Sequence, residues 1–277
     1  MIRNFLFLSL LLLISAKVTA QYFYKDVWNL LQLKKEMAIL KNEKIRTIEV
    51  KSFEDNGEPS EGFFCEKKLN KDYSFSGTLT RSLVTDQSLL TSHFDSDENI
   101  IQTTDSTESS ISRTQYSYDD DKRLLSVRTF TKAADNSSSI EETHNYSYNQ
   151  GGALEKMTRK KNEIEISTVN FKTDDRGNVI EEEEIFKNGE PKTYFYYYDD
   201  KNRLTDIVHY VERAKRLLPD YMYEYNSAGQ IKQMIATEEG GGYFLWKYTY
   251  NDRALRETEK CFSRERKLLG SIQYEYK

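Results

Sequence analysis

Three histidines are the first residues to consider for chemistry in this 277-residue sequence, because imidazole serves both as a metal ligand and as a general base. His93, His144 and His209 stand in separate segments, with no partner at the spacing of a metal site. A zinc-type site needs three or four converging ligands. We therefore expect each histidine to lie on a sheet face or in a loop, and we expect neither a metal nor a cofactor.

Acidic clusters are the second candidate for chemistry. Residues 95–99 (DSDEN) look like the start of a calcium loop, but Ile100 stands where the loop needs glycine and Ser106 where it needs glutamate. Residues 119–121 and 181–184 are acidic runs. We expect solvated surface charge at these runs, with weak calcium binding at turns as the alternative.

No nucleophile motif stands in the chain. Gly-x-Ser-x-Gly and a phosphate loop are both absent from the sequence. Among 45 acidic residues a pair of catalytic carboxylates could still be present, as in glycosidases. We expect a protein that is not an enzyme; a hydrolase of polysaccharide or peptidoglycan with two unidentified carboxylates is the alternative.

The first twenty residues predict export. Arg3 precedes an apolar run over residues 5–14, and Val18-Thr19-Ala20 places small residues at a cleavage site. We expect residues 1–20 to be a cleaved signal peptide, with a retained anchor as the alternative. The mature chain would then have no transmembrane segment and would reach the periplasm, the cell surface or the medium.

Net charge bears on the class of partner, and the number of cysteines bears on disulfide bonding. A net charge of −5 makes a nucleic-acid partner unexpected. Cys65 and Cys261 are the only cysteines, and in an oxidising compartment they could form a disulfide. Two buried thiols are the alternative.

An N-terminal region over residues 21–44 predicts one amphipathic helix. Apolar residues recur at helical spacing from Val27 to Leu40, and Asp26 is a plausible N-cap. We expect the helix to pack on the rest of the chain; binding a partner is the alternative.

An internal repeat organises residues 45–277. The pattern is aromatic–x–aromatic–Asp/Asn followed by an aliphatic residue, and its copies are 24 to 30 residues apart. Copies stand at residues 94–95, 116–119, 146–149, 171–174, 196–199, 223–226 and 248–251, with a partial copy at 274–276. Period-2 alternation on both sides of each copy predicts a β-hairpin of about 25 residues per repeat.

The Asp or Asn of each copy is expected to close a turn through its side chain, and a glycine four residues after the second aromatic to adopt a left-handed backbone. The expected turn residues are Asp119, Asn149, Asp174, Asp199, Asn226 and Asn251, with Gly152, Gly177 and Gly229.

Aromatic side chains are expected on both faces of two strands. Because side chains alternate along a strand, Tyr196 and Tyr198 should share the buried face, with Tyr197 opposite. We expect Phe195, Tyr197 and Phe244 on the other face, as candidates for contact with a protein or glycan. Cross-strand aromatic packing is the alternative reading of these three residues.

The architecture follows from the strand count. About 16 strands at about 4.8 Å give a sheet of roughly 75 Å, far wider than a helix of about 25 Å can cover. We therefore expect an all-β array of antiparallel hairpins forming a curled or spiralling sheet, with the helix at one end. A membrane barrel is a third possibility, but it needs an apolar outer band that the acidic run at 181–184 opposes.

The repeat resembles the Rhs/YD repeat of bacterial surface and secreted proteins, and residues 225–231 (YNSAGQI) are the nearest copy. The resemblance covers about residues 94–277 and implies an exported β-repeat protein. Large members of that family enclose a toxin domain, for which this chain has no room, and short exported proteins of Bacteroidetes look similar. We expect a non-catalytic cell-envelope binding or scaffold module for a protein or glycan. The ligand and the oligomeric state stay open at this point, as do closure of the sheet and the choice between periplasm and surface.

Overall fold

The computed structural model describes residues 22–83, 86–211, 214–238 and 242–277; the expected signal peptide lies outside these ranges. Within them one helix, α1 (Tyr24–Asn42), precedes 18 antiparallel strands. The strands are β1 (Thr47–Glu54), β2 (Phe64–Leu69), β3 (Phe75–Arg81), β4 (Ser88–Phe94), β5 (Ile100–Ser106), β6 (Ser110–Tyr118), β7 (Leu124–Ala133), β8 (Ser139–Tyr148), β9 (Leu154–Lys161), β10 (Ile164–Thr173), β11 (Val179–Phe186), β12 (Lys192–Tyr198), β13 (Leu204–Val211), β14 (Arg216–Tyr225), β15 (Ile231–Thr237), β16 (Tyr243–Tyr250), β17 (Arg256–Phe262) and β18 (Leu268–Tyr276).

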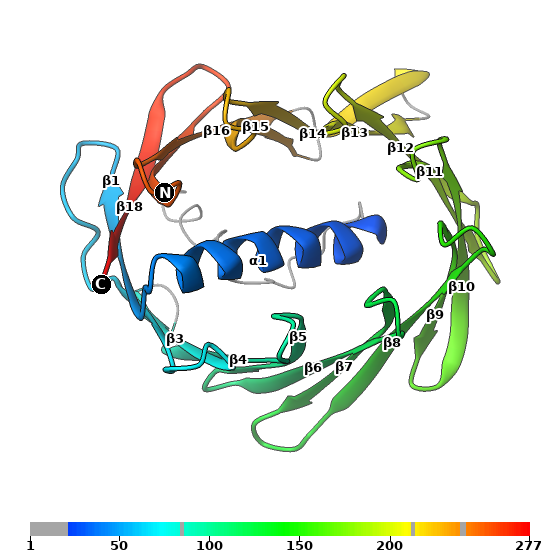
Figure 1. Ribbon diagram of the computed structural model, residues 1–277, viewed down its shortest axis with the longest axis horizontal. Helices are drawn as coiled ribbons and strands as arrows, with labels where there is room; N and C mark the ends of the chain where they lie inside the picture. The colour runs from blue at the N-terminus through cyan, green and yellow to red at the C-terminus, as the bar shows by residue number, and fades with distance from the viewer. Residues whose placement is uncertain (1–21, 84–85, 212–213, 239–241) are drawn as a thin grey trace.

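The strands form a closed barrel (Figure 1). Each strand pairs with the next, and β1 pairs with both β2 and β18, where seven residues align. The expectation of an all-β antiparallel fold with one N-terminal helix is confirmed, whereas the curled or spiralling sheet is wrong. Closure removes both sheet edges, whose unpaired main-chain groups would otherwise be open to other chains.

The repeat turns share one hydrogen-bond pattern. In seven hairpins the Oδ1 atom of the Asp or Asn accepts the main-chain N–H four residues later. These pairs are Asp95–Asn99, Asp119–Arg123, Asn149–Ala153, Asp174–Asn178, Asp199–Arg203, Asn226–Gln230 and Asn251–Leu255. In each of these turns the residue just before the N–H donor has a positive φ. This holds even where that residue is Glu98, Lys122 or Ala254. The turn therefore imposes the left-handed conformation on ordinary side chains as well as on glycine.

In six copies the second aromatic residue is a tyrosine that ties one hairpin to the preceding one. Its hydroxyl donates to the carbonyl of the residue that begins the second strand of that preceding hairpin, at 2.6 to 2.9 Å. The pairs are Tyr118–Ile100, Tyr148–Leu124, Tyr198–Val179, Tyr225–Leu204, Tyr250–Ile231 and Tyr276–Arg256. The two copies with Phe94 and Thr173 at this position lack the phenol hydroxyl. The tyrosine spacing thus holds neighbouring repeats in register.

The two faces of the wall differ in chemistry. Tyr196 and Tyr198 pack in the interior, and Tyr197 is 48% exposed on the outside, as the alternation predicts. Outward-facing ion pairs such as Lys51–Glu275 and Lys172–Glu181 bridge neighbouring strands on the outer face. The apolar and aromatic face of the sheet therefore lines the inside of the barrel.

Helix α1 lies inside the barrel, not at one end of a sheet (Figure 1). It crosses the ring from β11, where it begins, to β1 and β18, where it ends. Its first residues join an aromatic cluster with Tyr196 and Tyr223, and Met37 and Leu40 join a second cluster with Ile48. At 1.5 Å per residue its 19 residues are about 28 Å long, which is enough to bridge the interior.

The tyrosine tie between repeats can be measured. We expect Tyr198→Phe to lower the free energy of unfolding by about 1 kcal/mol, because the hydroxyl bond to the Val179 carbonyl is lost while the ring packing stays. Tyr197→Phe is the matched control, since its ring faces outward, and it should change the value by much less. Chemical denaturation of both variants checks this; equal losses would contradict the assigned role of the phenol.

Candidate functional site

Glu182 on β11 holds the N-terminus of α1. The residue before the helix, Phe23, has no side-chain cap, so the first N–H groups need another acceptor. The Glu182 carboxylate accepts the N–H of Phe23 at 2.7 Å and that of Tyr24 at 2.9 Å, and also the Tyr196 hydroxyl at 2.7 Å. A carboxylate at this end also suits the helix dipole. The wall of the barrel thus caps the helix from 158 residues away in sequence.

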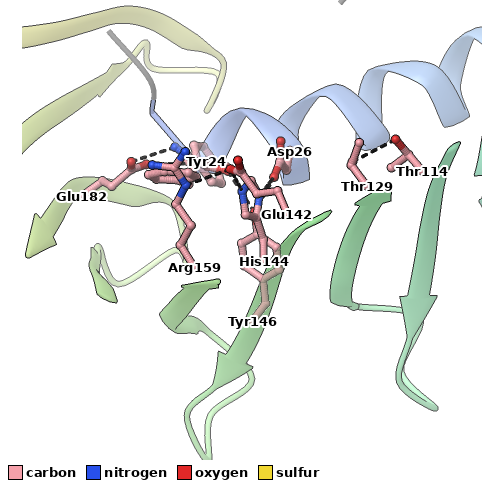
Figure 2. A network of polar contacts seen from close by, with 10 residues as sticks. Tyr24, Asp26, Thr114, Thr129, Glu142, His144, Tyr146, Arg159 and Glu182 are labelled. Carbon is pink, nitrogen blue, oxygen red and sulfur yellow. Dashed lines mark hydrogen bonds and ion pairs between the residues drawn. The ribbon is translucent and has the colours of Figure 1, made fainter. Parts of the chain in front are cut away.

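A second contact ties the first turn of α1 to β8 (Figure 2). The Asp26 carboxylate meets Nδ1 of His144 at 2.7 Å and accepts the Tyr146 hydroxyl at 2.7 Å. Asp26 is therefore a wall contact within the helix and not the N-cap expected from the sequence; the helix begins two residues earlier.

The polar chain continues along the wall. Nε2 of His144 lies 3.0 Å from Glu142, and Nε of Arg159 donates to the same carboxylate at 2.8 Å. Burial by itself lowers the pKa of His144, but the two flanking carboxylates raise it to about 9. Burial works against ionisation of Glu142, yet its bonds from His144 and Arg159 bring its pKa to about 2. His144 is consequently a protonated link between two carboxylates.

The pKa of Glu182 shifts in the opposite direction to that of Glu142, because at Glu182 burial outweighs the hydrogen bonds. Burial raises its pKa to about 7, although three hydrogen bonds favour the ionised form. Both of its oxygens are used and the side chain is fully buried. Glu182, Asp26 and His144 thus form an anchor that fixes the helix.

The sequence did not reveal this anchor. His144 lies on a sheet face in β8, as the sequence predicts, but on the buried inner face. The expectation of surface charge at residues 181–184 is wrong for Glu182 and Glu184, which are fully buried. The strand period was the available signal, since Glu182 pairs with Tyr194 in the neighbouring strand and both point inward. Because residues 181–184 are all glutamate, the sequence shows no difference between inward and outward positions there.

A groove of about 640 Å³ lies between α1 and one mouth of the barrel. Its helix side is formed by Tyr24, Val27, Leu30, Leu31 and Lys34. Its other side is formed by four repeat turns, at residues 98–100, 122–124, 149–154 and 174–179. In an antiparallel meander every second turn lies at the same mouth, so the repeats bring these turns together. Leu31 is 50% exposed at this surface.

Charge of both signs surrounds the groove. Lys34, Lys122, Arg123 and Arg176 contribute cations, and Glu98, Asp174 and Asp175 contribute carboxylates. Lys34 donates to Asn99 at 2.9 Å, which joins the helix to the rim. The ring of Tyr148 has the Arg123 guanidinium over it at 4.7 Å. The site is an apolar helix surface bordered by charged turns.

The aromatic candidates do not form one surface. Phe195 and Tyr197 point outward on β12, opposite Val208 and Asp206. The expectation for Phe244 is wrong: it pairs with Ala236 and packs with Trp246 and Tyr248 on the inner face. The physical reason is the phase of β16, in which Phe244, Trp246 and Tyr248 alternate on the same side.

The expected turn residues lie at the mouth that carries the groove. Asn149, Gly152, Asp174 and Gly177 line the groove itself. Asp119, Asp199, Asn226, Gly229 and Asn251 belong to the same series of turns. Cys65 and Cys261 are separate buried thiols and are not joined by a disulfide. The described part of the chain holds no group of three or more His, Cys, Asp or Glu residues placed to bind a metal.

Comparisons with known protein families and with curated proteins find no match. Among solved structures, a porin-like protein from Bacteroides uniformis is similar over 84% of this chain and 98% of its own, at 12% identity and a TM-score of 0.44. The TcdB2-TccC3-Cdc42 structure is similar over 74% of this chain and 13% of its own, at 12% identity and a TM-score of 0.34. A porin-like protein from Bacteroides vulgatus is similar over 84% of this chain and 98% of its own, at 10% identity and a TM-score of 0.25. Such weak likenesses carry no functional conclusion. No helix within the described ranges is long and apolar enough to cross a membrane.

The anchor predicts a pH dependence of stability. The pKa of His144 is raised from 6.5 to about 9, so its contribution is full below pH 6.5 and is lost as the pH rises to about 9. We expect His144→Gln to be less stable than wild type at and below pH 6.5 and to lose less stability than wild type between pH 6.5 and about 9. The pKa of Glu182 is raised from 4.5 to about 7, so its contribution to stability is lost as the pH rises from about 4.5 to about 7. This loss is expected in wild type and variant alike.

Urea denaturation across this pH range measures the effect. His93→Gln is the control, because the His93 ring faces outward against Phe75 and contacts neither carboxylate of the anchor. Identical pH profiles for wild type and His144→Gln would show that the histidine is not the protonated link.

Proposed function

We propose that this chain is a non-catalytic, exported binding module of the cell envelope, and that the groove beside α1 binds an apolar segment of a partner protein. The observation that carries the proposal is the half-exposed aliphatic surface of α1, with Leu31 at its centre, inside a groove of about 640 Å³. Ligand-binding pockets have volumes in this range, and they combine apolar walls with a few polar groups.

The lining favours a protein segment over a glycan. Val27, Leu30 and Leu31 offer aliphatic contact, which suits apolar side chains, whereas sugars stack on open aromatic faces. Arg123 already occupies a face of the Tyr148 ring, and the Tyr118 and Tyr148 hydroxyls are bonded to main-chain carbonyls. Lysine and aspartate side by side at the rim can pair with both signs of charge flanking an apolar motif.

The buried acids support a role without catalysis. A general acid or base must reach the substrate, but Glu182 has both oxygens bonded to α1 and Tyr196 and is closed to solvent. Asp26 and Glu142 are likewise engaged with His144. These carboxylates serve the fold.

Location in the envelope rests on the N-terminal sequence and the outer face of the wall. Residues 1–20 have the pattern of a secretory signal. Outward ion pairs such as Arg128–Glu141 favour a wall that contacts water, since a lipid-facing barrel requires an apolar outer band. The Tyr-x-Tyr-Asp/Asn repeat adds its resemblance to the Rhs/YD repeat of exported bacterial proteins.

The groove can be tested by substitution. Peptides selected from a random library on the protein without residues 1–20 should carry an apolar motif, and Leu31→Glu should weaken their binding at least tenfold, because a charge would be buried against that motif. Ile164→Glu is the control, since Ile164 is an exposed aliphatic residue outside the groove, and it should bind as wild type does.

Three results would contradict the proposal. Peptide binding that Leu31→Glu leaves unchanged would place the site elsewhere. A glycan whose binding Leu31→Glu abolishes would identify the groove as a sugar site. Hydrolysis of polysaccharide or peptidoglycan by the purified protein would show an enzyme.

Export has its own measurement. The protein isolated from the envelope fraction is expected to begin at Gln21, because Ala20 ends the small-residue cleavage pattern. Intact-mass spectrometry gives the answer directly. A mass that includes residues 1–20 would show a retained anchor.

A further inference from the structure

A second hollow, of about 300 Å³, lies on the outer wall over β6, β7 and β8. Its lining is Arg113, Gln115, Arg128, Phe130 and Glu141. In the register of the sheet Arg113 stands opposite Phe130, which stands opposite Glu141, and Gln115 stands opposite Arg128. Thr114 and Thr129, which alternate with these residues, face the interior and bond each other at 3.0 Å. The hollow is thus on the opposite face of the wall from α1.

The charges of this hollow leave one cation free. Arg128 and Glu141 form a two-bond pair, with Nε to Oε1 at 2.9 Å and Nη2 to Oε2 at 2.8 Å. The main-chain N–H of Glu141 donates to the Asn162 side chain at 2.9 Å, which steadies this strand position. Arg113 has no acidic partner in the described ranges of the chain. The pair cancels its own charge, which leaves the Arg113 guanidinium as the unpaired charge among the five lining residues. The Glu163 carboxyl lies outside this lining and acts on Arg128 and Glu141, not on Arg113.

An aromatic ring lies between the charged groups. Phe130 is 42% exposed although its neighbours on both adjoining strands are long polar side chains. An exposed aromatic ring beside planar polar side chains is the combination that binds a sugar, because C–H groups of a pyranose contact the ring while hydroxyls bond the amide, guanidinium and carboxylate groups.

We propose that this outer-wall hollow binds an acidic sugar residue of the uronate type, with its carboxylate on Arg113 and its pyranose ring on Phe130. Gln115 and the Arg128–Glu141 pair then supply donors and acceptors for the ring hydroxyls. A single free guanidinium matches a single carboxylate, and two parallel N–H donors fit its two oxygens. Glu141 disfavours a dianion such as phosphate at the same place.

This site is independent of the groove beside α1. The two surfaces share no lining residue and lie on opposite faces of the wall. A module that binds a polyuronate outside and a protein segment at its mouth could hold that protein at an acidic polysaccharide surface.

The test uses the trimer of α-1,4-linked galacturonic acid and the neutral galactose trimer of the same linkage, titrated into the protein and followed by calorimetry. We expect the acidic trimer to bind at least about tenfold more tightly than the neutral one. Arg113→Gln should remove this preference, and Phe130→Ala should weaken both trimers about tenfold. Arg264→Gln, at an exposed arginine of the β17–β18 turn, is the control and should change neither.

Four results would overturn the proposal: no binding of the acidic trimer, binding that Phe130→Ala leaves unchanged, competition by inorganic phosphate at equal concentration, or a preference that persists in Arg113→Gln. The second and third would indicate a simple anion site. Circular dichroism of each variant ensures that a loss of binding does not come from unfolding. Because Leu31→Glu should leave the acidic trimer bound, failure here and failure of the groove proposal are distinguishable.

Discussion

The width of an 18-stranded ring is the constraint on which the rest of this structure depends. A barrel of this size encloses more space than its inward side chains can fill, and large barrels commonly contain a channel or a plug. Here α1 crosses that space, and aromatic residues of the wall such as Tyr196 and Tyr223 fill the room around its first turns. The helix is therefore part of the core, and its position decides which surface remains open at the mouth.

Holding one helix across such an interior requires directional contacts. Apolar packing fixes distance but only weakly fixes rotation about the helix axis, whereas Glu182 and Asp26 bond to defined atoms at the first turn. The opposite end is set by Met37 and Leu40 against Ile48 of the first strand. With both ends fixed, Val27 and Leu31 face the turn rim, and the groove exists because of that rotation.

The repeat could be predicted because its causes are local. The turn bond from Asp199 to the Arg203 N–H and the alternation of Tyr196, Tyr197 and Tyr198 depend only on nearby residues. Closure could not be predicted in this way, because β1 carries no copy of the motif and its pairing with β18 joins residues more than 200 positions apart. The same limit applies to the site: the groove combines one helix face with four separate turns, and Glu182 meets Phe23 only once the barrel has closed.

The Glu182 carboxylate anchors α1 in the barrel. Hydrogen exchange of Glu182→Ala, compared with Glu224→Ala on the outer face of β14, tests it most directly. We expect exchange at least about tenfold faster in the first turns of α1, while β6 to β9 keep their protection, because the cap is lost and the wall bonds remain. Unchanged protection of α1 in Glu182→Ala would show that packing alone holds the helix and would contradict the anchoring role of Glu182.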